Sequence, residues 1–296
     1  MNRNDVWSGY SDFLSERFFD FSKYSSIGCG GIAPIAFYPK NKEETLSLLA
    51  RLKRDGRECL TLGNLTNVLP PDEGVDKALL FLKNLRSLTI RDELVFVEAG
   101  VTSGALLNAT RQAGLSGVEF LVGIPCVLGG ALFMNAGAGG RYISEAVESV
   151  TFYHEGKTLQ LSANDCEYVY KSSMFMREKG VILGATLRLK KSTQSSVKEN
   201  IAAWLERRAH LPKGKSMGCV FKNPQGVEVS AGKLIEGAGL KGLRVGGAVV
   251  AKAHANFIIN DKHATEKEIR ALIKMIKNAV FAQYKINLEE EIRYLG

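Results

Sequence analysis

Several features that would assign a chain of 296 residues to a common class are missing here. The five cysteines form no CxxC pair, so neither a zinc site nor a disulfide framework is indicated. The longest run without a charged or amide side chain, residues 120–134, contains Pro125 and is too short to span a membrane. Residues 1–22 are polar and aromatic, unlike a signal peptide. We therefore expect a cytoplasmic protein with no metal and no membrane insertion.

Nucleic-acid binding is also poorly supported, although the formal net charge is +8. The basic residues are scattered, and pairs such as Lys190-Lys191 and Arg207-Arg208 are too short to follow a phosphate backbone. None of the glycine clusters that lie next to a predicted strand matches GxGxxG or GxxxxGK[ST], which argues against a Rossmann fold and a P-loop. A positive charge equally suits an enzyme whose small-molecule ligands carry phosphates. The sequence does not specify an oligomeric state.

Hydrophobic periodicity and capping residues predict a mixture of helices and strands. Helices are expected at residues 41–56, 102–114, 201–208 and 265–280. Strands are expected at residues 33–38, 59–62, 95–99, 149–161, 180–190 and 286–295. The glycine-dense stretch 117–140 is expected to be neither helix nor flexible linker, because its apolar side chains need burial. The polar run 193–200 is predicted to cross into another domain.

Three glycine clusters, residues 28–31, 63–67 and 123–131, each lie next to a predicted strand. Glycine lets successive backbone N–H groups approach a ligand closely and form a nest for phosphate oxygens. The alternative for each cluster is a tight turn. Together they favour a dinucleotide held by backbone amides.

A second candidate site centres on Cys219. Gly218 precedes this cysteine, and Asn223-Pro224 follows four residues later, which predicts a bent segment that presents the thiol. A presented thiol is a candidate proton donor or nucleophile. The alternative is an inert, small hydrophobic side chain.

Polar residues near this frame are candidates for ligand contacts. Lys222 with Asn223, and His254 with Asn256, stand among apolar residues, and Glu291 lies near the end of the chain. The alternatives are a solvated lysine, a core histidine with its hydrogen bonds satisfied, and a surface glutamate.

These motifs, in this order, resemble the UDP-N-acetylenolpyruvoylglucosamine reductases (MurB). The resemblance extends from about residue 24 to the end of the chain. It rests on residues 117–125, 129–138, 218–224, 231–240, 254–260 and 288–293.

The resemblance implies an α+β fold: a two-lobed FAD-binding module of the vanillyl-alcohol-oxidase (PCMH) type, followed by a C-terminal α+β substrate domain. The expected domains are residues 1–67 (FAD-binding lobe 1), 68–192 (FAD-binding lobe 2) and 193–296 (substrate domain). No tyrosine-bearing insertion is evident, so the chain resembles the shorter class of these reductases.

The activity implied by the resemblance is reduction of UDP-N-acetylglucosamine enolpyruvate in peptidoglycan precursor synthesis. In this family NADPH reduces FAD, and the reduced flavin passes a hydride to the enolpyruvyl double bond. A side chain then donates a proton while a cation and a glutamate stabilise the developing charge. Matched by position, these roles fall on Cys219, Lys171 and Glu291.

Further roles are carried over from the family by position. Substrate-binding residues are expected to be Lys222, Asn223, His254 and Asn256. Residues that contact FAD are expected to be Gly63, Asn64, Leu65, Thr66, Asn67, Gly100, Gly123, Ile124, Pro125, Gly129, Gly130, Asn135, Ala136, Gly137 and Ile182.

Four positions depart from the family pattern. Cys219 replaces a serine, Lys171 an arginine, and Leu65 and Cys126 each replace a glycine. Lysine keeps the positive charge but lacks the planar fork that binds a carboxylate through two hydrogen bonds. The alternatives are therefore a divergent FAD-binding paralogue with altered or no reductase activity, or another flavin oxidoreductase of the same superfamily.

Overall fold

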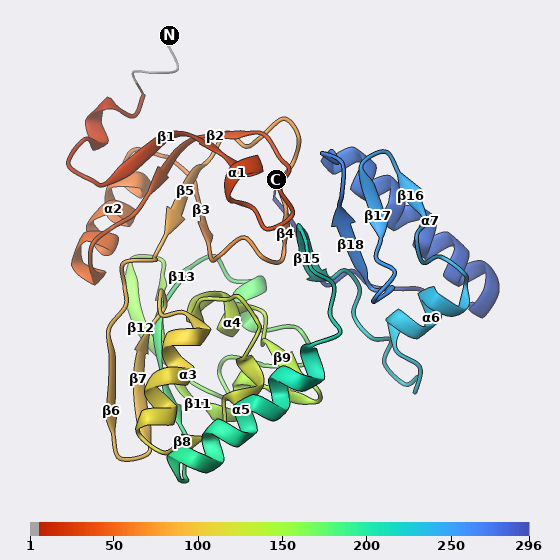
Figure 1. The fold of residues 1–296 in the computed structure, drawn as a ribbon. Coiled ribbons are helices and arrows are strands. Elements are labelled where there is room, and N and C mark those ends of the chain that lie inside the picture. Colours follow the sequence, from red (N-terminus) through yellow and green to blue (C-terminus); the bar gives the residue numbers. More distant parts are fainter. Residues whose placement is uncertain (1–5, 296) are drawn as a thin grey trace. The chain divides into compact units, whose positions relative to one another are not determined.

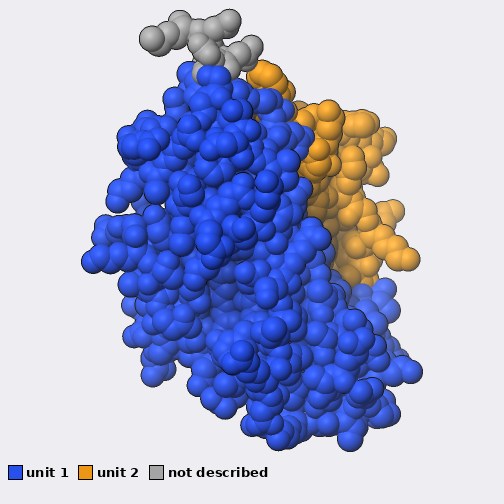
Figure 2. Space-filling model, turned by 90° about the vertical axis from the view of Figure 1, so that its left-hand side faces the viewer, with its two compact units in different colours: residues 1–17, 35–64, 77–209 blue, residues 18–34, 65–76, 210–296 orange. Residues whose placement is uncertain are grey.

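The computed structural model describes residues 6–295 and divides them into two compact units, which Figure 2 colours separately. Unit 1 contains residues 6–17, 35–64 and 77–209 of this described part. Unit 2 contains residues 18–34, 65–76 and 210–295. Each unit is therefore assembled from three separate stretches of chain.

The first sheet has the strand order β1-β2-β5-β3 (Figure 1). Its strands are β1 (Ser15–Asp20), β2 (Ile32–Phe37), β3 (Cys59–Leu62) and β5 (Ala78–Phe81). Helix α2 (Lys42–Arg54) connects β2 to β3, and the Asn41 side chain caps it by accepting the N–H of Glu44 at 2.8 Å. This confirms the predicted strand–helix–strand start, with β5 inserted between the two strands and parallel to both.

The second sheet, in unit 1, is antiparallel with the order β12-β11-β13-β7-β6. Its strands are β6 (Leu88–Arg91), β7 (Leu94–Glu98), β11 (Val147–His154), β12 (Lys157–Ser162) and β13 (Val181–Arg188). One hydrophobic core joins buried residues of this sheet to helices α3 (Ser103–Gln112) and α4 (Leu128–Phe133). Ile201 and Trp204 of helix α5 (Gln194–Arg208) pack against that core.

Unit 2 is built on a four-stranded antiparallel sheet of order β15-β18-β17-β16. Its strands are β15 (Ser216–Cys219), β16 (Arg244–Val245), β17 (Ala248–Val250) and β18 (Phe257–Asn260). Helices α6 (Ala231–Gly237) and α7 (Glu266–Tyr284) share a core with the sheet (Figure 1). The predicted capping box of Thr265 and Glu268 is present at the start of α7.

The shorter elements complete the chain. Two-residue strands β4 (Val68–Leu69) and β19 (Arg293–Tyr294) pair in parallel within unit 2. The others are η1 (Ser8–Tyr10), α1 (Phe21–Tyr24), β8 (Leu115–Ser116), η2 (Glu119–Leu121), β9 (Gly137–Ala138), β10 (Arg141–Tyr142), η3 (Ile143–Ala146), η4 (Met174–Met176) and β14 (Lys190–Lys191).

Three predictions about elements were wrong. The polar run 193–200 is not a crossover, because Thr193 caps α5 and the run forms its first half. The stretch 117–140 contains the short helix α4, whose Leu128, Ala131 and Leu132 are buried. The predicted strand 286–295 forms a ladder only at β19, although Leu288 and Ile292 are buried as its alternation predicted.

Candidate functional site

Residues 63–64 and 123–130, which belong to two of the three glycine clusters, lie side by side in unit 1. A Cβ atom built on Gly63 would lie 3.3 Å from Cγ2 of Val127 and 3.7 Å from Cα of Gly130. The side-chain amide of Asn64 donates to the carbonyl of Pro125 at 3.2 Å. Residues 63–64 and 123–130 therefore form one glycine-lined surface, which we call the flavin loops.

The backbone of the flavin loops is open at Gly130. A Cβ atom there would meet nothing within 4 Å, so space adjoins the main chain. The neighbouring N–H groups of Leu128 and Gly129 are bonded to the carbonyls of Val101 and Ala99, at 2.8 and 2.9 Å. The loop is thus fixed on one side while its glycine face can accept a bound molecule.

Two side chains outside the predicted set hold this loop. Ser103, at the start of α3, donates from Oγ to the carbonyl of Ile124 at 2.6 Å. Arg208, at the end of α5, donates from Nη2 to the carbonyl of Gly123 at 3.2 Å. The sequence did not predict either contact, because a serine at the start of a helix and an arginine at its end are common and do not indicate a distant partner.

The other residues of unit 1 that are predicted to contact FAD pack against, or form hydrogen bonds with, other parts of this unit. Gly100 lies so close to the carbonyl of Leu82 that a Cβ would approach it to 2.0 Å. Asn135 is buried with φ of 43°, and its amide binds the backbone of Val169 and Ser144 at 2.9 and 3.2 Å. Ala136 and Ile182 belong to the core cluster next to α4, and Gly137 begins β9.

Lys171 occupies a tight turn in unit 1. The backbones of Val169 and Ser172 pair across this turn, and Lys171 has φ of 53°, in the left-handed region. Its ammonium group donates to the carbonyl of Gly137 at 3.4 Å. The predicted cation therefore lies beside a predicted FAD-contact segment.

The third glycine cluster, residues 28–31, lies in unit 2 and serves close packing. A Cβ on Gly30 would come within 2.6 Å of the Pro70 side chain, and one on Gly31 within 2.5 Å of the Asp72 carbonyl. Of the two interpretations, a tight turn fits this cluster better than a nest for phosphate oxygens, because neighbouring atoms fill the space beside its glycines.

In unit 2, Cys219 is the last residue of the edge strand β15 and is half-buried. Gly218 before it has φ of 76°, and the register of β15 against β18 shifts between Ser216 and Cys219. This irregularity bends the chain at the thiol, as the sequence predicted. Only glycine adopts such a backbone conformation without strain.

Glu291 lies on the segment that pairs with the residues after Cys219. Its N–H donates to the carbonyl of Val220 at 2.8 Å, and its carbonyl accepts from the Asn67 side chain at 3.1 Å. The N–H of Lys222 donates to the carbonyl of Glu289 at 2.8 Å. The structure thus brings the predicted donor, the glutamate and Asn67 onto adjoining stretches of chain.

The two asparagines that are predicted to bind substrate, Asn223 and Asn256, have hydrogen-bond partners in the fold. Oδ1 of Asn223 accepts the N–H of Ala231 at 3.0 Å, at the start of α6. Asn256 is buried, and its amide bonds both the N–H and the carbonyl of Phe221, at 2.9 and 2.8 Å. Lys222 forms an ion pair with Glu289 at 2.5 Å. Asn256 therefore acts first as a clamp on the Cys219 segment.

His254 lies next to Gly232 of α6 and against Phe257. Its Nδ1 accepts the N–H of Asn256 at 3.3 Å, and its ring stacks near that of His210 with centroids 6.3 Å apart. Burial, followed by the neighbouring His210, lowers the pKa of His254 below its ordinary value. The lowered pKa favours the neutral imidazole, and because Nδ1 accepts the N–H of Asn256, the Nε2–H group is left to donate one hydrogen bond.

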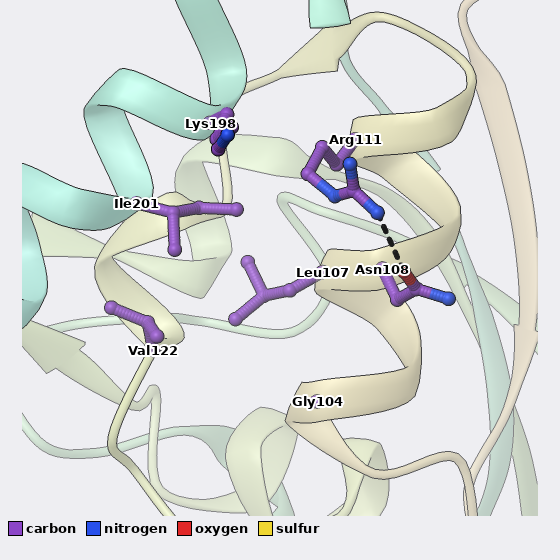
Figure 3. Close-up of a pocket in the computed structure, with 7 residues that line it drawn as sticks. All are labelled: Gly104, Leu107, Asn108, Arg111, Val122, Lys198 and Ile201. Atoms are coloured by element: carbon purple, nitrogen blue, oxygen red, sulfur yellow. Dashed lines mark hydrogen bonds between the residues drawn. The ribbon is translucent and has the colours of Figure 1, made fainter. Parts of the chain in front are cut away.

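A separate apolar pocket of about 350 Å³ lies between α3 and α5 in unit 1 (Figure 3). Leu107, Val122 and Ile201 project into it, while Arg111 and Lys198 stand at its sides. None of the predicted site residues lines it. In residues 6–295 no group of three or more His, Cys, Asp or Glu side chains could hold a metal, and no helix is long and apolar enough to span a membrane.

Comparison with known proteins first defines the class. Residues 33–162 match the family model described as "FAD binding domain". This range contains β2, α2, the second sheet's β6, β7, β11 and β12, and the flavin loops. The chain is therefore an FAD-binding protein of mixed α and β structure, which confirms the predicted cofactor.

The particular family follows from the rest of the chain. Residues 207–295 match the model for the C-terminal domain of UDP-N-acetylenolpyruvoylglucosamine reductase. The reductase of Geobacter metallireducens is 38% identical over 280 residues, covering 93% of this chain and 92% of that protein. That of Chlamydia pneumoniae is 38% identical over 276 residues, covering 93% and 90%.

Fold comparison agrees. The crystal structure of MurB from Thermus caldophilus matches with a TM-score of 0.82 and 30% identity, over 96% of this chain and 99% of that one. The chain belongs to the UDP-N-acetylenolpyruvoylglucosamine reductase (MurB) family. The predicted resemblance and the predicted fold class are both confirmed.

The flavin loops fit FAD as the cofactor of this family. The open backbone face at Gly130, opposite Gly63, is a surface that any larger side chain would narrow. The N–H groups of Leu128, Gly129 and Ala131 are bonded within the fold, so FAD at Gly130 would pack against the open main chain rather than bind these three amides. The residues that would hold it are those of the flavin loops, with Asn135 supporting the adjoining turn.

Proposed function

We propose that this chain catalyses the NADPH-dependent, FAD-mediated reduction of UDP-N-acetylglucosamine enolpyruvate to UDP-N-acetylmuramate. The reaction belongs to peptidoglycan precursor synthesis, and we place it in the cytoplasm. The observation that carries the proposal is that family similarity covers both the flavin loops and the bent Cys219 segment with its neighbouring Glu291. A flavoenzyme acting on another substrate would not need the second of these.

The proposed chemistry assigns a separate role to each polar group. When bound and reduced by NADPH, FAD would supply the hydride. Hydride addition to the terminal carbon of the enolpyruvyl group leaves negative charge on the adjacent carbon and on its carboxylate. The Cys219 thiol donates the proton that this adjacent carbon receives.

Two further groups stabilise that charge in the proposal. The ammonium of Lys171 attracts the substrate carboxylate. Glu291 is the second group, which the proposal assigns to the oxygen where charge develops. Lys222 and Asn223 bind the diphosphate side, and His254 and Asn256 support the substrate site.

We propose three domains with the predicted boundaries. Residues 1–67 and 68–192 bind FAD, and residues 193–296 bind the nucleotide sugar. The three FAD contacts Leu65, Thr66 and Asn67 fall in unit 2, at the end of the loop that starts with Gly63. They are proposed to act with the flavin loops.

A second candidate is a paralogue that binds FAD but has altered activity. It is favoured by Leu65, which adopts φ of 53° at a position where the family pattern has glycine. A left-handed leucine costs on the order of 1 kcal/mol, so the loop keeps its shape under strain.

An anaerobic titration of the flavin separates the two candidates. NADPH should bleach the yellow absorption of the bound flavin, and UDP-N-acetylglucosamine enolpyruvate should then restore it. A flavin that bleaches but never regains its colour would favour the paralogue.

Cys219→Ala tests the proposed proton donor. It should leave bleaching by NADPH at the wild-type rate and slow recolouration by roughly 10²–10⁴-fold, because only the second step needs the donor. Cys59→Ala, at a half-buried cysteine in β3, should change neither step. Equal slowing of both steps in Cys219→Ala would contradict the assigned role.

A further inference from the structure

The chain segment that carries Glu291 is attached to α7 by the residue before it. Glu290 accepts hydrogen bonds from Nζ of Lys277 at 2.8 Å and from the hydroxyl of Tyr294. Its side chain is 20% exposed, so this ion pair is shielded from water more than a surface pair. The contact joins the C-terminal segment to the third quarter of a 19-residue helix.

The same network continues toward the first turn of α7. The guanidinium carbon of Arg270 lies 3.8 Å from the centroid of the Tyr294 ring. Arg270 also pairs with Glu266, which is buried. Asp72 in turn accepts the N–H of Glu266 at 2.7 Å, so the network reaches an anchored helix end.

The pKa shifts of Glu290 and Tyr294 favour the protonation states that their hydrogen bond requires. Burial alone would raise the pKa of Glu290, but the hydrogen bonds from Lys277 and Tyr294 hold it below its ordinary value. Burial and the charge of Glu290 raise the pKa of Tyr294 above its ordinary value. Glu290 is therefore an ionised acceptor and Tyr294 a neutral donor.

The backbone holds this segment at a few points. Glu290 forms one isolated bridge with Phe221, the N–H of Glu291 donates to the carbonyl of Val220 at 2.8 Å, and β19, which begins three residues after Glu290, is two residues long. These bonds fix the main chain, and the contacts of the Glu290 side chain fix the face to which that side chain points. Because successive residues of an extended chain point to opposite faces, fixing Glu290 against α7 directs Glu291 to the other face.

We propose that Glu290, held by Lys277 and Tyr294, is a positioning residue that fixes where Glu291 stands relative to the Cys219 segment. The inference rests on the proposed function, in which Glu291 stabilises charge on the substrate. It assigns to α7 a role in the proton-transfer step. Small errors of placement in such a step have large kinetic costs, about 10²-fold for 1 Å.

Glu290→Gln is the first test, because it preserves shape and removes the charge that Lys277 binds. We expect kcat for reduction of UDP-N-acetylglucosamine enolpyruvate to fall roughly 10- to 100-fold with KM nearly unchanged. Bleaching of the flavin by NADPH should keep its wild-type rate. Asp261→Asn, which removes an exposed ion pair with Arg244 in the same unit, should change neither.

Substitution of Lys277 provides a second test of the ion pair if Glu290→Gln folds poorly. Lys277→Met should reproduce the loss of kcat, and Lys277→Arg, which retains a cation for Glu290, should retain most of the activity. Equal losses in Lys277→Arg and Lys277→Met would overturn the ion-pair argument.

Coupling to Glu291 decides between positioning and a general structural role. In a Glu291→Gln background, Glu290→Gln should cause little further loss, because there is no longer a carboxyl group to position. The inference would be overturned if the losses of kcat in the two single variants multiplied in the double variant. It would also be overturned if Glu290→Gln slowed bleaching of the flavin by NADPH as much as it slows substrate reduction. If Glu291→Gln alone reduced substrate at the wild-type rate, the proposed role of Glu291 would fail instead.

Discussion

Asn256 shows how a single buried amide can organise the chain segment next to it. Its side chain bonds both backbone groups of Phe221, and its own carbonyl accepts the N–H of Val220 at 2.8 Å. These bonds fix the two residues that directly follow Cys219. The position of the thiol therefore depends on an amide that directly precedes the neighbouring strand β18.

We expect Asn256→Ala to lower the free energy of unfolding by about 2–3 kcal/mol, because it leaves a buried N–H and a buried carbonyl without partners. Urea denaturation monitored by circular dichroism measures this. Asn164→Ala, at an exposed turn, is the matched control and should cost less than about 0.5 kcal/mol. Equal costs for the two variants would show that the clamp contributes nothing.

The sequence marked Asn256 as special but could not state which groups it binds. The His254-Ala255-Asn256 motif predicts a polar residue among apolar ones, and the structure confirms the burial. Whether an amide faces a ligand or its own backbone depends on the strand opposite, which local pattern does not specify. The same applies to Asn223, whose partner Ala231 is eight residues away.

At the scale of elements, the flavin loops depend on a helix that is rich in glycine. Helix α4 has only six residues, two of them Gly129 and Gly130. Glycine destabilises a helix interior, so its presence needs another reason. A Cβ on Gly129 would meet Ala99 at 3.3 Å, whereas one on Gly130 would meet open space. Packing explains the first glycine, and access to the backbone explains the second.

Gly130→Ala should therefore separate stability from cofactor binding. We expect the apoprotein to gain about 0.5–1 kcal/mol of unfolding free energy, because alanine favours helix. The Kd for FAD, measured by quenching of flavin fluorescence, should rise at least about tenfold if the flavin uses that space. Urea denaturation of the apoprotein checks the first effect.

The control for this substitution is Gly104→Ala in α3. A Cβ there also meets nothing within 4 Å, so stability should rise without a change in FAD affinity. If both variants bind FAD equally well, the open face at Gly130 is not part of the cofactor site.

Elements with strong local signals were predicted well, and those that depend on distant partners were not. Thr265 with Glu268, and Thr102, start α7 and α3 as expected. Helix α5 was missed in its first half because Val197 is its only buried residue, so no apolar periodicity marks it. The terminal strand was predicted too long because alternation of apolar and polar residues indicates which side chains are buried. A hydrogen-bonded ladder also needs a neighbouring strand along its whole length.

For the whole molecule, each unit has hydrophobic cores of its own. Two buried clusters lie wholly within unit 1 and one within unit 2. The flavin loops and Lys171 belong to unit 1, and Cys219, His254 and Glu291 belong to unit 2. The chain length predicted several domains and the family resemblance implied an α+β fold, but contiguous boundaries could not anticipate units that are each built from three stretches.

This division predicts that the two ligands protect different backbone amides from hydrogen exchange, because binding suppresses local opening where it occurs. FAD should slow exchange most in residues 123–130 of the apoprotein. UDP-N-acetylglucosamine, which lacks the reducible group, should then slow exchange in residues 219–223 of the FAD-loaded protein. Residues 157–162, an exposed edge strand in unit 1, are an internal control that neither ligand should change. Protection of residues 219–223 by FAD alone, with no further effect of the nucleotide sugar, would contradict the proposed assignment of the Cys219 segment to substrate binding.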